Sequence, residues 1–349
     1  MRRVGILGLP QSGKSTVFEI LMQGAGSSAS GGREQIGIVR VPDDRIDRLS
    51  ELFRPKKTTY TQIQFVDSAA AGHLSARVAA KGPDLFSSVR NCDGLVAVVR
   101  DFENPMAPAP NGVDAARDLR ELEAELILND LAIAETRMER IEKELKIGKK
   151  QGEPEHKLLA RIKASLEAER PLRGERFDAE EEKLLRGFQF LTRKPLLVVY
   201  NQDEQSNRVP PDAGPGTRSV GLKAHLEREI IALPAAERPA FRAEMGMTED
   251  GLSLLIRSCY ELLGLISFFT VGPDEVRAWT IHAGERAVDA AGEIHSDLAR
   301  GFIRAEVSEW KRLVELGGTA AARSAGQLRL EGRDYVVHDG DCIEVRFNA

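Results

Sequence analysis

The chain has 349 residues, of which 42% are hydrophobic and 30% are charged, and its formal net charge is −5 at pH 7. One hydrophobic core serves at most roughly 250–300 residues, so the length predicts two or three domains. The slightly acidic balance excludes a protein that binds nucleic acid through a global basic field, so any RNA contact must come from a local patch.

The first predicted elements are a buried strand at 2–9 and a helix with one apolar face at 13–23. The residues between them match the phosphate-loop pattern G-x-x-x-x-G-K-S, whose glycines let backbone N–H groups turn inward onto phosphate oxygens. A chance glycine turn is the alternative, and the flanking strand and helix favour the phosphate loop. The predicted nucleotide-binding residues here are Gly8, Leu9, Pro10, Gln11, Ser12, Gly13, Lys14, Ser15 and Thr16.

Three side chains are predicted to act on the phosphates and their metal ion. Lys14 would reach the β and γ oxygens, and Ser15 would offer its hydroxyl to Mg²⁺. A strand predicted at 60–68 carries Asp67 near its end, where a carboxylate can orient Mg²⁺ through water; a helix-capping role is the alternative. We therefore expect Lys14, Ser15 and Asp67 to be catalytic, with Ser15 and Asp67 forming the metal site.

Continuous apolar runs at 93–100 and 194–201 predict central parallel strands that are buried on both faces. The second run leads into N-Q-D-E (201–204), at the position where ligand loops of open α/β sheets lie. Guanine readers of the phosphate-loop class usually show N-K-x-D there, with the Asp accepting from two guanine N–H groups. The amide of Asn201 suits the mixed donor and acceptor edge of adenine, whereas Glu204, if rotated, would still accept from guanine. The residues favour adenine and leave guanine open.

Residues 114–189, between these two strands, show apolar residues at three-, four- and seven-residue steps among many charges. The pattern breaks at 148–155, which predicts two antiparallel helices. Residues 135–176 contain twelve Lys or Arg against nine Asp or Glu, a net charge of +3. This mild basic excess indicates either a solvated coiled-coil face or a contact for RNA or the ribosome.

From about residue 267 the pattern becomes short alternating runs separated by turn dipeptides, which predicts a small α+β domain. A phosphate-loop α/β domain is therefore expected at 1–113 and 190–266, a helical insertion at 114–189, and the α+β domain at 267–349. The expected core residues of the last domain are Val276, Trp279, Ile281, Phe302, Ile303 and Val345.

The cysteines Cys92, Cys259 and Cys342 are scattered, without a C-x-x-C pair or a histidine at ligand spacing. They support neither a disulfide framework nor a zinc site, and they fit a reducing compartment. The N-terminal apolar run is too short for a signal peptide or a membrane span. We expect a cytoplasmic protein with no membrane association and no sequence-specific DNA binding.

The order of these motifs resembles the YchF/Obg-like ATPase family from end to end. The resemblance is carried by the phosphate loop, "FVDSAA" (65–70), the helical arm, "NQDE" (201–204) and, most specifically, "FFTVGPDEVRAWTIHAGERAVDAAGEIHSDLARGFIRAEV" (268–307) and "GRDYVVHDGDCIEVRFN" (332–348). It implies a P-loop domain with a mostly parallel sheet, a coiled-coil insertion and a C-terminal TGS domain with a ubiquitin-like fold. It also implies ribosome association, slow Mg²⁺-dependent hydrolysis of ATP rather than GTP, and a base motif N-x-x-E that Asn201 and Glu204 match.

Two segments depart from the family pattern. A simple alignment puts Gly31 where the family has the Thr of its first switch, within a Gly- and Ser-rich segment (24–35) that we expect to be mobile without nucleotide. The family motif D-x-A-G ends here on Ala70, whose methyl restricts backbone approach to the γ-phosphate. The second switch is replaced by residues 71–84, in which His73 is either a residue that orients water or an ordinary solvent-facing histidine.

Three functions follow from these observations. The first is a slow Mg²⁺-dependent ATPase, and the second is a module that holds nucleotide without productive turnover, which Gly31 and Ala70 favour. The third is a GTPase with relaxed base choice.

Overall fold

The structure is a computed structural model. It describes residues 1–23, 25–31, 34–68, 86–109, 111–211, 214–247 and 249–348, so Ala70 and the whole predicted second switch, with His73, lie outside the described residues. The chain divides into two units, the first formed by Met1–Val39 with Gln64–Ser258 and the second by Arg40–Ile63 with Cys259–Ala349. Each unit has a sheet of its own. Within the described part of the chain, no helix is long and apolar enough to cross a membrane.

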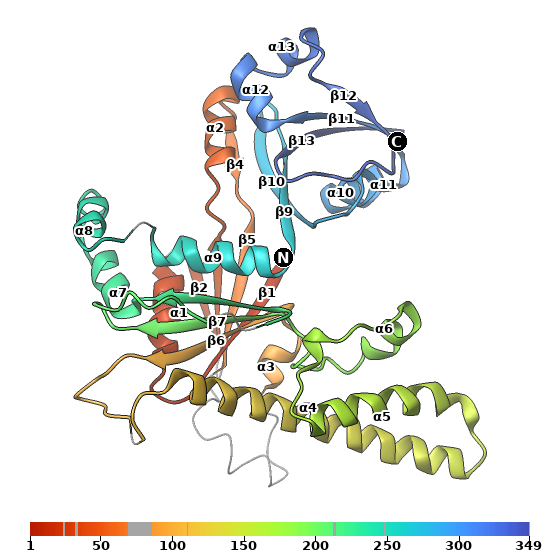
Figure 1. Cartoon of the computed structure of the whole chain (residues 1–349). Coiled ribbons are helices and arrows are strands. Elements are labelled where there is room, and N and C mark those ends of the chain that lie inside the picture. The colour runs from red at the N-terminus through yellow and green to blue at the C-terminus, as the bar shows by residue number, and fades with distance from the viewer. Residues whose placement is uncertain are drawn as a thin grey trace. The chain divides into compact units, whose positions relative to one another are not determined.

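The first unit is built on a seven-stranded sheet of order β2-β3-β5-β1-β6-β7-β8 (Figure 1). Its strands are β1 (Arg2–Gly8), β2 (Ala25–Gly31), β3 (Glu34–Arg40), β5 (Gln62–Ser68), β6 (Gly94–Asp101), β7 (Leu196–Gln202) and β8 (Thr217–Leu222). The pairs β1–β6, β6–β7 and β7–β8 are parallel. The α/β class and the central position of the two apolar runs, now β6 and β7, are therefore confirmed.

The helices that begin in the first unit are α1 (Lys14–Gln23), α3 (Ser87–Arg90), α4 (Ala115–Lys146), α5 (Glu153–Glu167), α6 (Ala179–Leu185), α7 (Ala224–Ala232), α8 (Arg238–Glu244) and α9 (Gly251–Leu262). Short 3₁₀ turns occur at Lys150–Gly152 and Leu172–Gly174. The start of α4 packs on one face of the sheet, where Leu122 and Leu126 join a core with Leu95, Val99 and Leu196. This contact fixes the helical arm to the strands that lead to the site.

The Gly- and Ser-rich segment of the first unit differs from the sequence expectation. Residues 25–31 form β2, which pairs antiparallel with β3. No strand was predicted here, and the pairing arises because the β-prone run "EQIGIVR" of β3 offers a hydrogen-bonding edge that overrides low local propensity. Mobility of this segment without nucleotide stays a prediction. Gly31 lies at the end of this hairpin, opposite Glu34.

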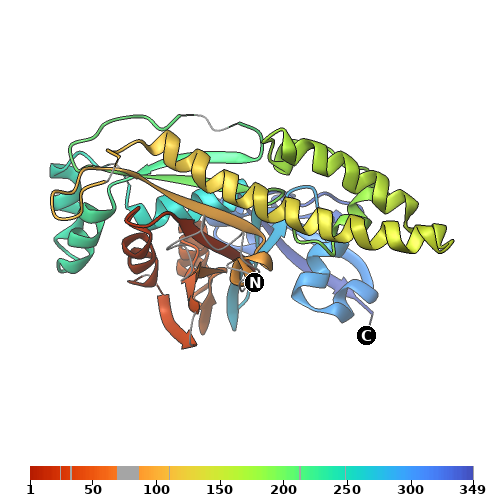
Figure 2. The same ribbon diagram turned by 90° about the horizontal axis from the view of Figure 1, so that it is seen from below.

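The helical arm consists of α4 and α5, which lie side by side as a hairpin (Figure 2). Asp114 caps α4 by accepting from the backbone N–H of Arg117 at 2.9 Å. Beyond the sheet, Ile141 of α4 packs with Leu159 and Ile162 of α5 in a separate core. The two predicted helices and the break between them are confirmed.

One buried carboxylate ties the root of the arm to the start of β7. Asp130 of α4 is fully buried and accepts hydrogen bonds from Leu191 N at 2.9 Å and from the backbone and hydroxyl of Thr192, both at 2.7 Å. Burial raises the pKa of Asp130, and these hydrogen bonds oppose that shift. The chain that returns from the arm is thereby held where β7 begins.

The second unit has a six-stranded sheet of order β12-β11-β13-β9-β10-β4. Its strands are β4 (Lys57–Thr59), β9 (Leu265–Thr270), β10 (Glu275–His282), β11 (Phe302–Glu309), β12 (Arg329–Glu331) and β13 (Asp341–Phe347). Its helices are α2 (Asp44–Phe53), α10 (Ala287–Ile294), α11 (Ser296–Arg300), α12 (Trp310–Leu316) and α13 (Thr319–Ser324). Figure 1 shows α10 on one side of this sheet and α2 with α12 on the other.

Two hydrophobic clusters fill the second unit. In one, Phe268 and Ile281 pack with the alanines of α10. In the other, Phe269 and Val276 pack with Ile46 and Leu49 of α2. The segment 40–63 therefore supplies core residues to a unit that the sequence placed wholly after residue 266.

Five of the six expected core residues of this unit pack as expected. Val276, Ile281 and Phe302 are buried, and Trp279 and Val345 pack against the cluster with part of their surface exposed. The prediction that Ile303 belongs to the core was wrong, because its side chain is 48% exposed. Phe302 and Ile303 are neighbours on β11, and successive side chains of a strand point to opposite faces, so Ile303 faces solvent while Phe302 joins the core.

Candidate functional site

The phosphate loop lies between β1 and α1, and its backbone has the shape that anion binding requires. Gln11 and Gly13 have φ values of 63° and 87°, which place them in the left-handed region. A Cβ added at Gly8 would lie 2.6 Å from Ser12 Oγ, and one added at Gly13 would lie 2.1 Å from Asn201 Nδ2. Only glycine therefore fits at these two positions, as the motif predicted.

Two charged side chains meet at this loop. Lys14 Nζ donates to Asp67 Oδ1 in a close ion pair, and both side chains are largely buried. Lys14 is the first residue of α1, and Asp67 is the last residue but one of β5. The structure thus brings together the predicted phosphate-binding lysine and the predicted metal-binding carboxylate.

The remaining loop residues fit a polyphosphate with a divalent cation. Ser15 is exposed on the first turn of α1, and Thr16 beside it lines a pocket. Ser12 is buried, and its hydroxyl finds no hydrogen-bond partner among the described residues. An unpaired hydroxyl in a cradle of backbone N–H groups is chemically suited to an anionic ligand.

Asn201 joins the phosphate loop to the base side of the site. Its side chain is buried; Nδ2 donates to the carbonyl of Ser12 at 3.1 Å, and Oδ1 accepts from Ala224 N at 3.3 Å. The sequence pattern predicts that this amide contacts the edge of the base. The structure instead uses both ends of the amide to connect the loop, the end of β7 and the start of α7.

Arg100 is a site residue that sequence reasoning missed. Its guanidinium is buried and donates to Gln11 Oε1 at 3.2 Å, to the carbonyl of Phe102 at 3.1 Å and to that of Ala107 at 2.8 Å. It also lies 4.8 Å from the centre of the Phe102 ring. Arg100 therefore ties the loop after β6 to the phosphate loop. The sequence signal that could have identified it is the position of Arg100, a charged residue near the end of the otherwise apolar strand β6.

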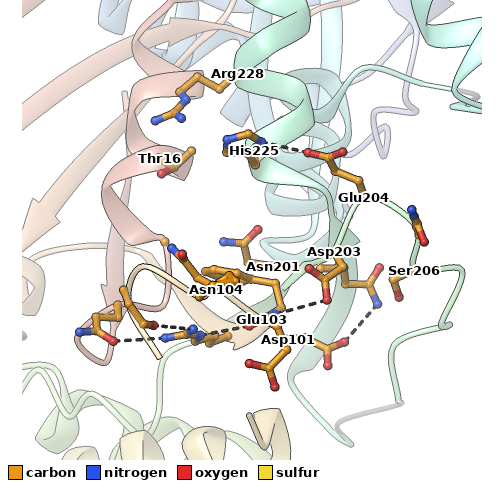
Figure 3. A pocket seen from close by; sticks show the side chains of 18 of the residues that line it. Thr16, Asp101, Glu103, Asn104, Asn201, Asp203, Glu204, Ser206, His225 and Arg228 are labelled. Carbon is orange, nitrogen blue, oxygen red and sulfur yellow. Dashed lines mark hydrogen bonds and ion pairs between the residues drawn. The ribbon is translucent and has the colours of Figure 1, made fainter. Parts of the chain in front are cut away.

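A pocket of about 920 Å³ opens beside the phosphate loop, large enough for a nucleoside. Its walls come from the loops after β6 and β7 and from the first turns of α1 and α7. Figure 3 shows Thr16, Asn201, Glu204, His225 and Arg228 around this space. The predicted residues Asn201 and Glu204 thus lie in one pocket with the phosphate-loop residues Gln11, Gly13 and Thr16.

The fold and the site define a P-loop nucleotide-binding protein. The phosphate loop with its glycines and lysine, and the pocket beside it, all lie at the carboxyl ends of parallel strands. Residues 265–348 match the family model YchF-GTPase_C, described as a protein of unknown function (DUF933). The chain is 39% identical over 361 residues to the "Ribosome-binding ATPase YchF" of Bacillus subtilis (strain 168) and 36% identical to its namesake in Escherichia coli O157:H7. Each comparison covers 99% of both chains.

A solved structure agrees over the same length. The "Schizosaccharomyces pombe YchF GTPase" matches with a TM-score of 0.82 and 26% identity, over 99% of this chain and 97% of that one. The chain belongs to the YchF family.

The contacts of Asn201 lead to a first prediction. Asn201→Ala is expected to weaken MgATP binding about ten-fold, because it leaves buried polar partners unpaired at a cost on the order of 1–3 kcal/mol. Affinity for Mg²⁺-tripolyphosphate should fall in parallel, since the amide acts through the phosphate loop. Calorimetry with both ligands measures this, and Gln151→Ala, an exposed change in the helical arm, is the control. An unchanged tripolyphosphate affinity would mean that Asn201 reads the base directly.

Proposed function

We propose that this chain binds ATP with Mg²⁺ at the phosphate loop, hydrolyses it slowly and associates with the ribosome. The observation that carries the proposal is the continuity of the site. Lys14 and the glycine cradle form its phosphate side, and Asn201 connects that side directly to a nucleoside-sized pocket. Both halves of a nucleotide therefore find chemistry that suits them.

The metal part of the proposal rests on Ser15 and Asp67. The hydroxyl of Ser15 and the carboxylate of Asp67 are oxygen donors of the kind Mg²⁺ prefers. Ser15 follows Lys14 in the chain, and Asp67 accepts a hydrogen bond from the Lys14 side chain. Bound Mg²⁺ would neutralise charge on the phosphates. On binding, Lys14 would exchange its contact with Asp67 for the phosphate oxygens, which would free the carboxylate to face the metal's water shell.

The choice of ATP over GTP rests on the base loop. Guanine-binding proteins of this class have a carboxylate that accepts from two N–H donors of the base. Here Glu204 Oε1 already contacts His225 Nδ1 at 3.0 Å. GTP remains the second candidate, because a rotated Glu204 would restore that contact. Comparison of the two affinities by calorimetry decides between them.

Ribosome association is supported by the printed names of the bacterial relatives and by the arm. Within the described arm, Arg137 and Lys163 are paired with acids across the helices, each at 2.7 Å. Lys146, Lys149 and Lys150 at the turn of the hairpin are exposed. Exposed lysines at the end of a long arm suit phosphates of ribosomal RNA. Co-sedimentation of the purified chain with ribosomes, at low and high salt, tests this part.

The second prediction concerns turnover. We expect the chain alone to hydrolyse ATP well below about 1 s⁻¹, since Lys14 and Mg²⁺ hold the ground state while Gly31 carries no hydroxyl for the γ-phosphate. Single-turnover hydrolysis at fixed Mg²⁺ and K⁺, with and without ribosomes, measures the rate. Faster turnover by the chain alone would contradict this. Tight ATP binding with no hydrolysis in either condition would favour the nucleotide-holding module instead.

A further inference from the structure

The outer rim of the pocket carries a carboxylate and an imidazole that contact each other. Glu204 lies in the turn after β7, and His225 is the second residue of α7. Glu204 Oε1 and His225 Nδ1 are 3.0 Å apart (Figure 3). Their side chains are 46% and 59% exposed, so the pair is accessible to a ligand that enters the pocket.

The other acid of this loop is held by the opposite wall. Asp203 Oδ2 accepts from the backbone N–H of Glu103, in the loop after β6, at 3.3 Å. The two neighbouring carboxylates are therefore drawn apart, Asp203 toward the β6 loop and Glu204 toward α7. One oxygen of each carboxylate is thereby engaged.

This arrangement affects the two purine bases differently. The edge of guanine presents adjacent N–H donors, and binding it well requires a carboxylate with two oxygens available. The edge of adenine presents one amino donor beside a ring acceptor, so it gains much less from such a carboxylate. A contact that occupies Glu204 therefore costs GTP more affinity than ATP, and specificity is that difference.

Building on the proposed nucleotide function, we infer that His225 is a specificity-determining residue, which holds Glu204 at α7 and thereby lowers the affinity for GTP relative to ATP. Glu229, one turn further along α7, has its Oε1 3.7 Å from the same imidazole nitrogen. A carboxylate oxygen of Glu229 also lies within 4.8 Å of one of Glu204. This neighbour provides a comparison variant, because its contact with the imidazole is longer than that of Glu204.

The test is the ratio of the GTP and ATP dissociation constants, measured by calorimetry with MgATP and MgGTP. His225→Ala is expected to lower this ratio about two- to five-fold, the size expected for one exposed ion pair. The change should come from tighter GTP binding, with ATP affinity nearly constant. Mg²⁺-tripolyphosphate, which has no base, should bind equally well to the wild type and the variant.

Two further variants separate this role from a merely structural one. Glu229→Ala keeps the contact between Glu204 and His225, so it should change the ratio less than His225→Ala does. In a Glu204→Ala background, His225→Ala should have no effect on the ratio, since the carboxylate it positions is gone. An unchanged ratio for His225→Ala alone, or an equal change in the Glu204→Ala background, would overturn the inference.

The proposed function can fail separately. A wild-type chain that prefers GTP would refute the proposed base choice whatever the variants do. A wild-type chain that prefers ATP, with a ratio insensitive to His225, would refute only the role of His225. A chain that binds neither nucleotide would refute both.

Discussion

Lys14→Ala is expected to weaken MgATP binding by about a hundred-fold or more, which is the largest effect on function that we predict. Removing one partner of a desolvated charged contact costs on the order of 2–5 kcal/mol. Arg100, the buried arginine of the site, does not replace the lysine, because its guanidinium is engaged with Gln11 and two carbonyls. Calorimetry with MgATP measures the loss.

A control must separate loss of the phosphate contact from loss of the ion pair with Asp67. Asp67→Asn removes the same ion pair but keeps the lysine. It should retain binding of ATP in the absence of Mg²⁺, whereas Lys14→Ala should not. Equal losses in both variants would show that the ion pair shapes the loop and that Lys14 is not the main phosphate ligand.

Ile46→Ala is expected to lower the free energy of unfolding of the second unit by about 2–4 kcal/mol. Ile46 is fully buried and packs in the cluster with Phe269 and Val276. The protein provides its own probe, because its two tryptophans, Trp279 and Trp310, both lie in this unit. Denaturant titration followed by tryptophan fluorescence therefore reports on the second unit.

Two variants accompany this measurement. Ile46→Val removes a single methylene and should cost only about 0.5–1.5 kcal/mol, which keeps the test usable if the alanine variant does not fold. Ile303→Ala alters an exposed isoleucine of the same unit and should change the midpoint little. Equal midpoints for the wild type and Ile46→Ala would mean that α2 is not part of the cooperative core.

The parts of the site that the sequence predicts are those that depend on local spacing. The phosphate loop is a continuous motif, so its residues and its place between β1 and α1 follow from eight letters. Asp67 and Asn201 are predicted nearly as well, because each comes at the carboxyl end of an apolar run and parallel strands present those ends at one edge.

The parts that the sequence does not predict depend on which distant residues meet. Asn201 bonds the carbonyl of Ser12 across 189 positions, and Arg100 reaches Gln11 across 89. The residues around Asn201 and Arg100 in the sequence do not predict which distant residue each one contacts. The strand β2 was missed for a related reason, since its pairing is provided by β3 and not by its own glycines and serines. His225 looks like any polar residue at a helix start until Glu204 is placed beside it.

The split of the second unit between Arg40–Ile63 and Cys259–Ala349 bears on how the chain is made. A ribosome adding about 5–20 residues per second needs roughly 10–40 s to synthesise the intervening segment 64–258. Throughout that interval Ile46 and Leu49 have been made but their partners on β9 and β10 have not. During synthesis, the apolar face of α2 therefore lacks its packing partners in every nascent chain. In a chain that terminates early, that face stays exposed to chaperones and proteases.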